Sequence, residues 1–115
     1  MKKIYHLATC STCARIIDEL ELKKKGFTFQ DIRTEKITPA QLDEMKEKAG
    51  SYEALFSRVA LKYKTLDSKP TKENEYRKLI LAEDTFLKRP VILFKNNIYI
   101  GNSKKNIEAA QLALK

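Results

Sequence analysis

The chain has 115 residues, 43% of them hydrophobic, which matches one domain able to form its own core without a disulfide scaffold. Lys and Arg (23) outnumber Asp and Glu (15), giving a formal net charge of +8. Because most of the basic residues are lysines that alternate with acids, the charge indicates a solvated surface and gives only weak support to nucleic-acid binding.

The N-terminal part of the chain alternates between strand and helix patterns. A short apolar and aromatic run at residues 3–8 predicts a buried strand that ends at a polar turn. Apolar residues at three- and four-residue spacing over 13–20 then predict one face of a helix. Ser11 or Thr12 is expected to cap its start, and Gly26 to end it.

The middle of the chain is predicted to be mainly helical. Large apolar and polar residues alternate over 27–32, which predicts a second strand with one buried face. Thr38 followed by Pro39 gives an N-cap and a first-turn proline, and the helix that they begin is expected to stop at Gly50. A further short helix is expected at 52–56.

The C-terminal part returns to strands. Residues 59–72 are irregular and predict a connecting loop, followed by a helix over 71–86. Two β-rich runs at 91–94 and 98–100 predict a hairpin. A closing helix is expected over 103–114.

This element order predicts the fold. A β-α-β half, several helices and a β-β-α half follow one another, which is the thioredoxin arrangement. We therefore predict an α/β, thioredoxin-like fold with a mixed sheet. Residues 1–115 are expected to form a single domain, with a helical insertion at approximately 38–86 between the two halves.

Two cysteines lie three residues apart at the predicted strand-to-helix turn. Amides and the dipole at a helix N-terminus stabilise an anion, so the pKa of Cys10 is expected to be lowered toward neutrality. Cys10 is then the nucleophile, and Cys13 can resolve a mixed species by forming an internal disulfide. Zinc binding is the weaker alternative because the chain offers only these thiols and His6 as Cys or His ligands, and an inert pair is a third. No metal or resident cofactor is expected.

Two further features each have a structural and a functional interpretation. His6 is either a structural residue of the first strand, with its hydrogen-bonding groups satisfied there, or a donor that stabilises the Cys10 thiolate. Arg89-Pro90 is either a simple strand start or a cis peptide bond that places the backbone beside the cysteine turn.

The chain shows no signal-peptide pattern and no apolar run approaching the roughly 20 residues of a membrane span. We therefore expect a cytoplasmic protein without a membrane partner. In a reducing compartment, a pair of cysteines more often takes part in chemistry or metal binding than in a structural disulfide.

Several short motifs together carry a family resemblance. They are Tyr5-His6 ahead of Cys10, Cys10-Ser11-Thr12-Cys13, Ser57-Arg58, and Leu87-Lys88-Arg89-Pro90-Val91. With them the chain resembles the arsenate reductase (ArsC) and Spx family of thioredoxin-like proteins over nearly its whole length. The first motif is similar to that of glutaredoxin-linked arsenate reductases, and the C-x-x-C motif to the redox switch of Spx.

The resemblance implies roles for individual residues. Cys10 would attack arsenate or a thiol partner, His6 would help to keep Cys10 ionised, and Pro90 would be a cis proline. The residues expected to bind the anion are Arg58, Arg89, Ser11 and Thr12.

One departure from the family pattern concerns the substrate. Arsenate reductases of this type carry a third arginine after the last strand, in Gly-Arg-Pro, where this chain has Gly101-Asn102-Ser103. Lys104 and Lys105 are either solvated helix lysines or point charges that substitute for it.

The resulting functional prediction is a thiol-disulfide oxidoreductase similar to arsenate reductase. Its expected partners are an oxyanion or disulfide substrate and an external reductant, which would be thioredoxin, glutaredoxin or a low-molecular-weight thiol. The alternative is an Spx-like redox-sensing transcriptional regulator that binds RNA polymerase, through its α subunit, without catalysis. Direct nucleic-acid binding is motivated only by the net charge and is not favoured.

Overall fold

The computed structural model describes all 115 residues and divides them into two compact units. The first unit consists of Met1–Glu35 and Arg89–Lys115, and the second of Lys36–Lys88. The insertion expected at 38–86 falls within the second unit.

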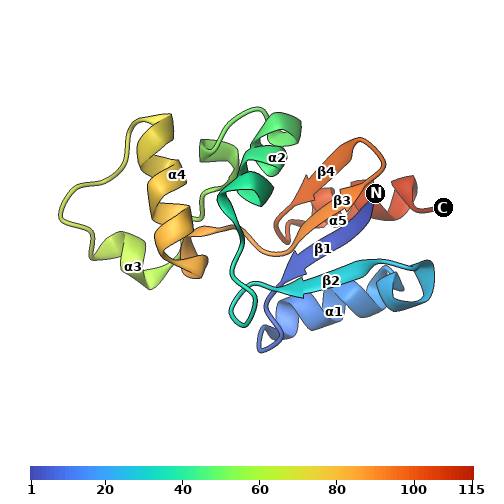
Figure 1. The fold of residues 1–115 in the computed structure, drawn as a ribbon. Coiled ribbons are helices and arrows are strands. Elements are labelled where there is room, and N and C mark those ends of the chain that lie inside the picture. Colours follow the sequence, from blue (N-terminus) through green and yellow to red (C-terminus); the bar gives the residue numbers. More distant parts are fainter. The chain divides into compact units, whose positions relative to one another are not determined.

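A mixed four-stranded sheet in the order β2-β1-β3-β4 forms the first unit (Figure 1). β1 pairs in parallel with β2 and antiparallel with β3, and β3 pairs antiparallel with β4. Since Tyr5 lies opposite Val91, and Val91 opposite Ile100, the ends of β1 and β4 and the start of β3 share one sheet edge. The strands are β1 (Lys2–His6), β2 (Thr28–Asp31), β3 (Val91–Phe94) and β4 (Asn97–Ile100). This arrangement confirms the predicted α/β, thioredoxin-like fold.

Two helices of the first unit, α1 (Ser11–Glu19) and α5 (Lys104–Ala113), pack against the same buried cluster. The cluster joins Ile4 and Ile92 of the sheet to Ile16 of α1 and Ala110 of α5. The helices therefore cover the same face of the sheet, and both run away from the shared edge (Figure 1). Ile107 of α5 also packs against this cluster.

The start of α1 differs from the prediction. Its N-cap is Cys10, whereas Ser11 and Thr12 are the first helical residues, and no side chain caps the helix. The Cys10 N–H donates to the carbonyl of Leu7 (2.9 Å), and its carbonyl accepts from the N–H of Ala14 (3.1 Å). Helical bonding therefore begins at the cysteine itself, which leaves the first amides of the helix directed toward its side chain.

The end of α1 was also predicted wrongly, because the helix stops at Leu20 rather than at Gly26. Glu21 is left-handed (φ 53°) and leads into a 3₁₀ segment, Leu22–Lys25. Leu20 and Leu22 are both buried. In a continuous helix the side chains of Leu20 and Leu22 would point about 200° apart, so only one of them could face the core. The interruption allows both to be buried.

The second unit contains α2 (Pro39–Ala49), α3 (Leu61–Lys64) and α4 (Glu73–Ala82), with 3₁₀ turns at Glu53–Leu55 and Asp84–Phe86. The predicted loop at 59–72 thus contains one helical turn, and the predicted helix at 71–86 is interrupted at Glu83.

Aromatic packing holds the second unit together. The buried ring of Phe56 stacks on Phe86 (5.2 Å between centroids) and meets Tyr63 and Tyr76 edge-on. Phe56 also pairs with Leu87 in a single antiparallel bridge. The unit therefore has an aromatic core of its own.

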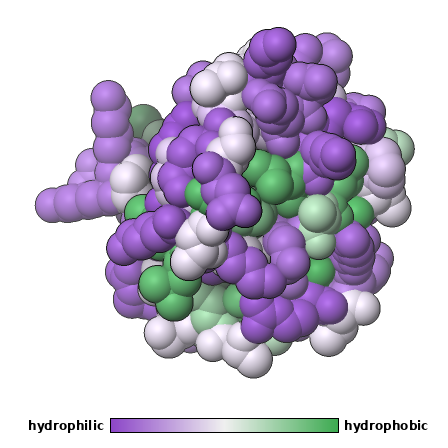
Figure 2. All heavy atoms as spheres, turned by 90° about the vertical axis from the view of Figure 1, so that its left-hand side faces the viewer, coloured by the Kyte–Doolittle hydropathy of each residue, from purple (hydrophilic) through white to green (hydrophobic).

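Hydrophilic side chains dominate the face of the molecule drawn in Figure 2, with smaller hydrophobic areas between them. The exposed large apolar side chains of the second unit are Val59 and Leu61. None of the helices combines the length and the apolar character that crossing a bilayer demands.

The start of α2 allows a stability prediction. Thr38 Oγ1 accepts from the N–H of Gln41 (3.1 Å), and the Gln41 side chain accepts from the N–H of Thr38 (3.1 Å), which forms the predicted cap. Thr38→Ala is expected to lower the free energy of unfolding by about 1 kcal/mol. Chemical denaturation measures this change, with Ser68→Ala at an exposed position as the control. Equal stability of the two variants would contradict the capping role.

Candidate active site

The two cysteines occupy the start of α1, beside the shared sheet edge. Cys10 is the N-cap and is half-buried, and Cys13, one turn into the helix, is 1% exposed. Both are free thiols. The structure therefore presents one accessible sulfur with a second, buried sulfur next to it.

Several groups act on the Cys10 thiol. Burial opposes ionisation, but the N–H groups of Cys13 and Thr12, the Cys13 thiol and the charge of Arg89 together outweigh it. The pKa of Cys10 consequently lies below its ordinary value. A lowered pKa increases the fraction of the nucleophilic thiolate at neutral pH.

The pKa of the Cys13 thiol is shifted in the opposite direction, upward. Burial is the largest cause and raises the pKa of Cys13 to about 11, although the N–H of Leu7 acts against it. The hydrogen bond to Cys10 raises it further. Cys13 therefore keeps its proton while Cys10 is ionised, and donates it in a hydrogen bond to the thiolate.

Arg89 brings a positive charge to this end of the sheet. It acts electrostatically on both thiols, which places its guanidinium near the cysteine pair. Its Nη1 is buried and has no hydrogen-bond partner. A buried donor without a partner is unfavourable, and a bound oxyanion would supply the missing acceptor.

The backbone next to Arg89 is held in place by β4. The Arg89–Pro90 peptide bond is cis, the form that the resemblance implies, and Pro90 is buried. The carbonyl of Pro90 accepts from the N–H of Gly101 (2.8 Å), just past the end of β4. Asn102 follows directly.

Ser11 and Thr12 contribute differently from each other. The N–H of Thr12 stabilises the Cys10 thiolate. Ser11 is exposed at the first position of α1. The first amides of a helix lack partners within it, so this turn can also donate to a bound anion.

His6 has neighbours other than the cysteines. Its ring meets Phe29 edge-on (5.6 Å between centroids). Burial lowers the pKa of His6, partly offset by the charge of Asp31. Near neutral pH, His6 is therefore mainly uncharged.

This geometry predicts how Cys10 alkylation depends on pH. Only the thiolate reacts, so the rate rises as pH passes the pKa of Cys10, and the lowered pKa moves the midpoint below that of an unperturbed cysteine. His6→Ala is expected to leave the midpoint unchanged. Iodoacetamide kinetics from pH 5 to 10 test both statements, and a higher midpoint in His6→Ala would show that the imidazole stabilises the thiolate.

Arg58 lies in the second unit, where it is anchored by its own neighbours. Its Nη2 donates to Glu53 Oε2 (2.9 Å) and to the Tyr76 hydroxyl (2.8 Å), and its guanidinium lies over the Tyr76 ring (5.4 Å). The adjacent Ser57 is buried and donates its N–H to the carbonyl of Phe86 (2.7 Å). The structure thus brings together Cys10, Cys13, Thr12 and Arg89 in the first unit and describes Arg58 within the second.

The sequence motifs missed one contributor to the site, which is the Cys13 thiol acting as a hydrogen-bond donor to Cys10. The three-residue spacing was a signal for it, because such spacing brings two side chains of one helical turn together. No group of three or more His, Cys, Asp or Glu side chains is placed to hold a metal ion.

Comparison with known proteins gives one family. The ArsC family model matches residues 5–110. The arsenate reductase from Vibrio cholerae has a similar structure (TM-score 0.78, 14% identity, 99% of this chain and 97% of that chain covered). So does an ArsC-related protein from Brucella melitensis (0.71, 24%, 94% and 92%) and a protein from Staphylococcus aureus COL (0.75, 22%, 95% and 97%). No curated protein matches the sequence, and these identities establish a shared fold.

Proposed function

The chain belongs to the ArsC family, and from that premise we propose that it is a thiol-dependent oxidoreductase with Cys10 as nucleophile and Cys13 as resolving thiol. The observation that carries the proposal is the opposite displacement of the two thiol pKa values. A half-exposed sulfur with a lowered pKa is suited to attack a substrate, and a buried sulfur with a raised pKa is suited to act second.

A disulfide substrate would react in two exchanges. The Cys10 thiolate attacks one sulfur of the substrate, a mixed disulfide forms, and the other sulfur leaves as a thiolate. Cys13 then loses its proton and attacks the Cys10 sulfur, which forms the internal disulfide and releases the second substrate thiolate. Two electrons pass from the cysteine pair to the substrate, and an external dithiol or two monothiols restore the pair.

An arsenate substrate would follow the same order. The Cys10 thiolate attacks arsenic, an As–O bond breaks, and the oxygen leaves as water after protonation. When Cys13 attacks the Cys10 sulfur, the S–As bond breaks and its electron pair stays on arsenic, which is thereby reduced to arsenite. The unpartnered Nη1 of Arg89 and the first amides of α1 would bind the substrate oxygens.

Steady-state oxidation of a reductant tests this function. The assay uses two reductant systems, thioredoxin with its reductase and glutathione with glutaredoxin. Each is tested with arsenate and with a small disulfide as substrate. We expect substrate-dependent turnover that requires Cys10. Turnover with the disulfide alone would restrict the activity to thiol exchange, and absence of turnover with every pair would contradict the enzymatic proposal.

The role implied for Arg58 gives a further prediction. If Arg58 binds the substrate anion, Arg58→Ala is expected to raise KM for the anionic substrate about ten- to a hundredfold, because it removes a charged hydrogen bond. The KM for a neutral disulfide should change little. Arg77→Ala is a matched control, because Arg77 also bonds a carboxylate of its own unit, that of Asp43 (2.9 Å). Equal KM values in the two variants would remove Arg58 from the site.

A second candidate function is an Spx-like regulator that uses the same cysteine pair as a switch. Asn102 in place of the third arginine favours it, because anion binding is less essential to a switch than to an arsenate reductase. Co-purification with the RNA polymerase α subunit under oxidising but not reducing conditions, without reductant turnover, would support this function over the enzyme.

A further inference from the structure

The Arg58 guanidinium is surrounded by side chains of the second unit and is still accessible to solvent. Its Cζ lies 5.4 Å from the centroid of the Tyr76 ring and 5.9 Å from that of Phe56. The Glu53 carboxylate is the largest influence on the pKa of Arg58, which it raises, and the Tyr63 hydroxyl acts in the same direction. The Arg58 side chain is nevertheless 44% exposed. An anion from solvent can therefore reach a guanidinium whose position is already fixed.

Two hydrogen bonds converge on one nitrogen of this guanidinium. Arg58 Nη2 donates to Glu53 Oε2 (2.9 Å) and to the Tyr76 hydroxyl (2.8 Å). Because a terminal guanidinium nitrogen carries two hydrogens, both hydrogens of Nη2 are in use. The other donors of the group are the single N–H on Nε and the two on Nη1.

Nη2 determines whether an arginine can hold an oxyanion by two parallel bonds. A guanidinium offers two such forks, one formed by Nε with Nη2 and the other by Nη1 with Nη2. Each fork needs one hydrogen of Nη2. With both of these hydrogens engaged, Arg58 has no complete fork free, and an oxyanion can receive only single bonds from Nε or Nη1.

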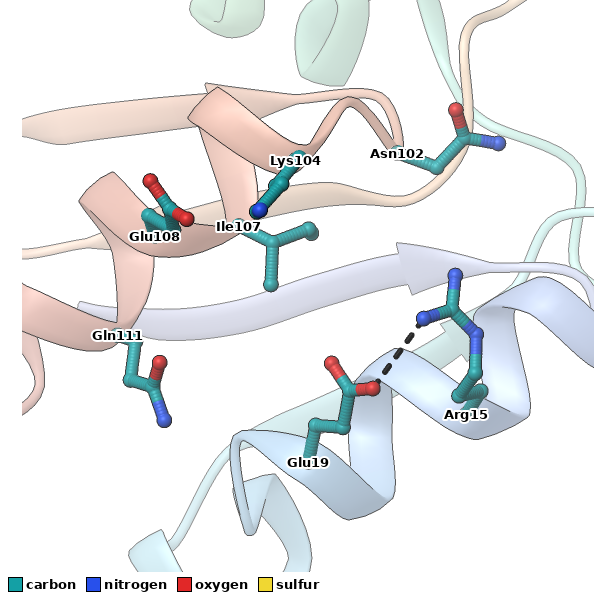
Figure 3. A pocket seen from close by; sticks show the side chains of 7 residues that line it. All are labelled: Arg15, Glu19, Asn102, Lys104, Ile107, Glu108 and Gln111. Atoms are coloured by element: carbon teal, nitrogen blue, oxygen red, sulfur yellow. Dashed lines mark hydrogen bonds and ion pairs between the residues drawn. The ribbon is translucent and has the colours of Figure 1, made fainter.

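Two other arginines show the alternatives. Arg77 gives its Nε–Nη2 fork to the two oxygens of Asp43 (2.9 and 3.3 Å). Arg15 donates only through Nη1 to Glu19 (3.2 Å), the dashed contact in Figure 3, and keeps Nε and Nη2 free. One carboxylate thus fills a fork at Arg77 and leaves one open at Arg15, whereas two acceptors divide Nη2 between them at Arg58.

Of the two acceptors on Nη2, Glu53 is the one that an anion would displace. Its side chain is 56% exposed, so water can replace the bond to Arg58. Its carboxylate also has the same sign of charge as the anion and would repel it. Tyr76 is only 5% exposed and packs against Phe56 (5.1 Å between centroids). Its neutral hydroxyl can therefore stay bonded while the anion binds.

We propose that Glu53 is a specificity-determining residue of an anion site at Arg58, where an oxyanion held by two parallel bonds displaces the Glu53 carboxylate from Nη2. Tyr76 keeps the guanidinium in place during this exchange. A tetrahedral oxyanion gains a fork in return for the lost bond, whereas a single-atom anion gains nothing that Nη1 does not already offer. That the oxyanion is a substrate rests on the proposed function, whereas the exchange itself does not.

Sulfate, a tetrahedral dianion that thiols do not reduce, tests the exchange without turnover. Its binding is followed through the backbone NMR signals of residues 53–58 in ¹⁵N-labelled protein. Glu53→Gln keeps the size of the side chain but removes its charge, and should tighten sulfate binding about three- to fivefold, the upper range for an exposed ion pair. No sulfate-dependent shift of these signals, or equal affinity in wild type and Glu53→Gln, would overturn the proposal.

Glu83→Gln is the matched control for net charge. Glu83 forms a 2.9 Å ion pair with Lys62 in the same unit, and its side chain is similarly exposed. The substitution removes the same charge without touching Arg58, so sulfate affinity at residues 53–58 should not change. An equal gain in Glu83→Gln and Glu53→Gln would assign the effect to net charge and overturn the exchange.

Two comparisons separate the forks of Arg58 from its charge. Chloride accepts a single bond, which Nη1 already offers, so Glu53→Gln should change chloride affinity much less than sulfate affinity. In an Arg58→Lys background the ammonium has three rotatable donors and no fork, so Glu53→Gln should no longer tighten sulfate binding. Equal gains for the two anions, or an undiminished gain with Arg58→Lys, would show that Glu53 acts only by its charge and would contradict the exchange.

A separate arm connects the site to the reaction. Glu53→Gln is expected to lower KM for arsenate about three- to fivefold with little change in kcat, and to leave KM for a neutral disulfide unchanged. Turnover of arsenate with an unchanged KM would overturn the role of Glu53 in specificity. No turnover with any substrate would count against the proposed function alone, because sulfate binding is measured without turnover.

Discussion

Replacing Cys10 with serine is expected to abolish turnover of disulfide and arsenate alike, because a serine hydroxyl is not ionised at neutral pH and cannot attack at a useful rate. Cys13→Ser is expected to retain the first attack but to stop at the mixed species, since no second thiol lies beside Cys10. Single-turnover kinetics with mass detection separate the two steps. Wild-type turnover in Cys13→Ser would show that Cys13 is not the resolving thiol.

A comparison of two Cys13 variants separates its electrostatic role from its redox role. Cys13→Ala removes the donor to the Cys10 thiolate, whereas Cys13→Ser retains a hydroxyl. The alkylation midpoint of Cys10 should therefore lie at higher pH in Cys13→Ala than in Cys13→Ser.

Arg89→Ala is expected to reduce kcat/KM for an anionic substrate about 10²- to 10³-fold, the usual effect of removing an oxyanion donor. The same change should raise the pKa of Cys10, because the Arg89 charge is one of the causes that lower it. A neutral disulfide should lose less activity, since only the second effect applies to it. Arg89→Lys keeps the positive charge but lacks the planar pair of donors. It should therefore bring the pKa of Cys10 close to the wild-type value while kcat/KM for the anionic substrate stays lower.

The control for Arg89 is Arg33→Ala, an exposed arginine of the same unit. It should leave kcat/KM for both substrates unchanged. Equal losses for anionic and neutral substrates in Arg89→Ala would mean that Arg89 acts only through the thiol and does not bind the oxyanion.

Much of the fold could be predicted because its local patterns agree with its tertiary structure. The alternation at 27–32 and the apolar run at 91–94 became paired strands, and Thr38 with Pro39 began a helix as predicted. The errors fell where tertiary packing overrides local pattern. Burial of Leu20 and Leu22 ended α1 early, and the interruption at Glu83 divided the long helix that periodicity favoured.

The site was predictable in part. The C-x-x-C spacing and the helix-start argument predicted a lowered pKa for Cys10, and the structure confirms its direction. That Arg89 acts on a thiol 79 positions away in the chain depends on the pairing of β1 with β3, which no local pattern encodes. The neutral state of His6 likewise follows from burial beside Phe29, which its position in the sequence did not reveal.

The roles proposed for Cys10 and Cys13 are tested by following both thiols during reaction with one equivalent of substrate. Samples are quenched by alkylation under denaturing conditions, and the mass of the intact protein is measured by mass spectrometry. We predict that Cys10 and Cys13 lose alkylation together, that the product is an internal disulfide, and that an external dithiol restores both thiols. Cys10 blocked by substrate with Cys13 still fully alkylated at completion, or both thiols unchanged, would contradict these roles.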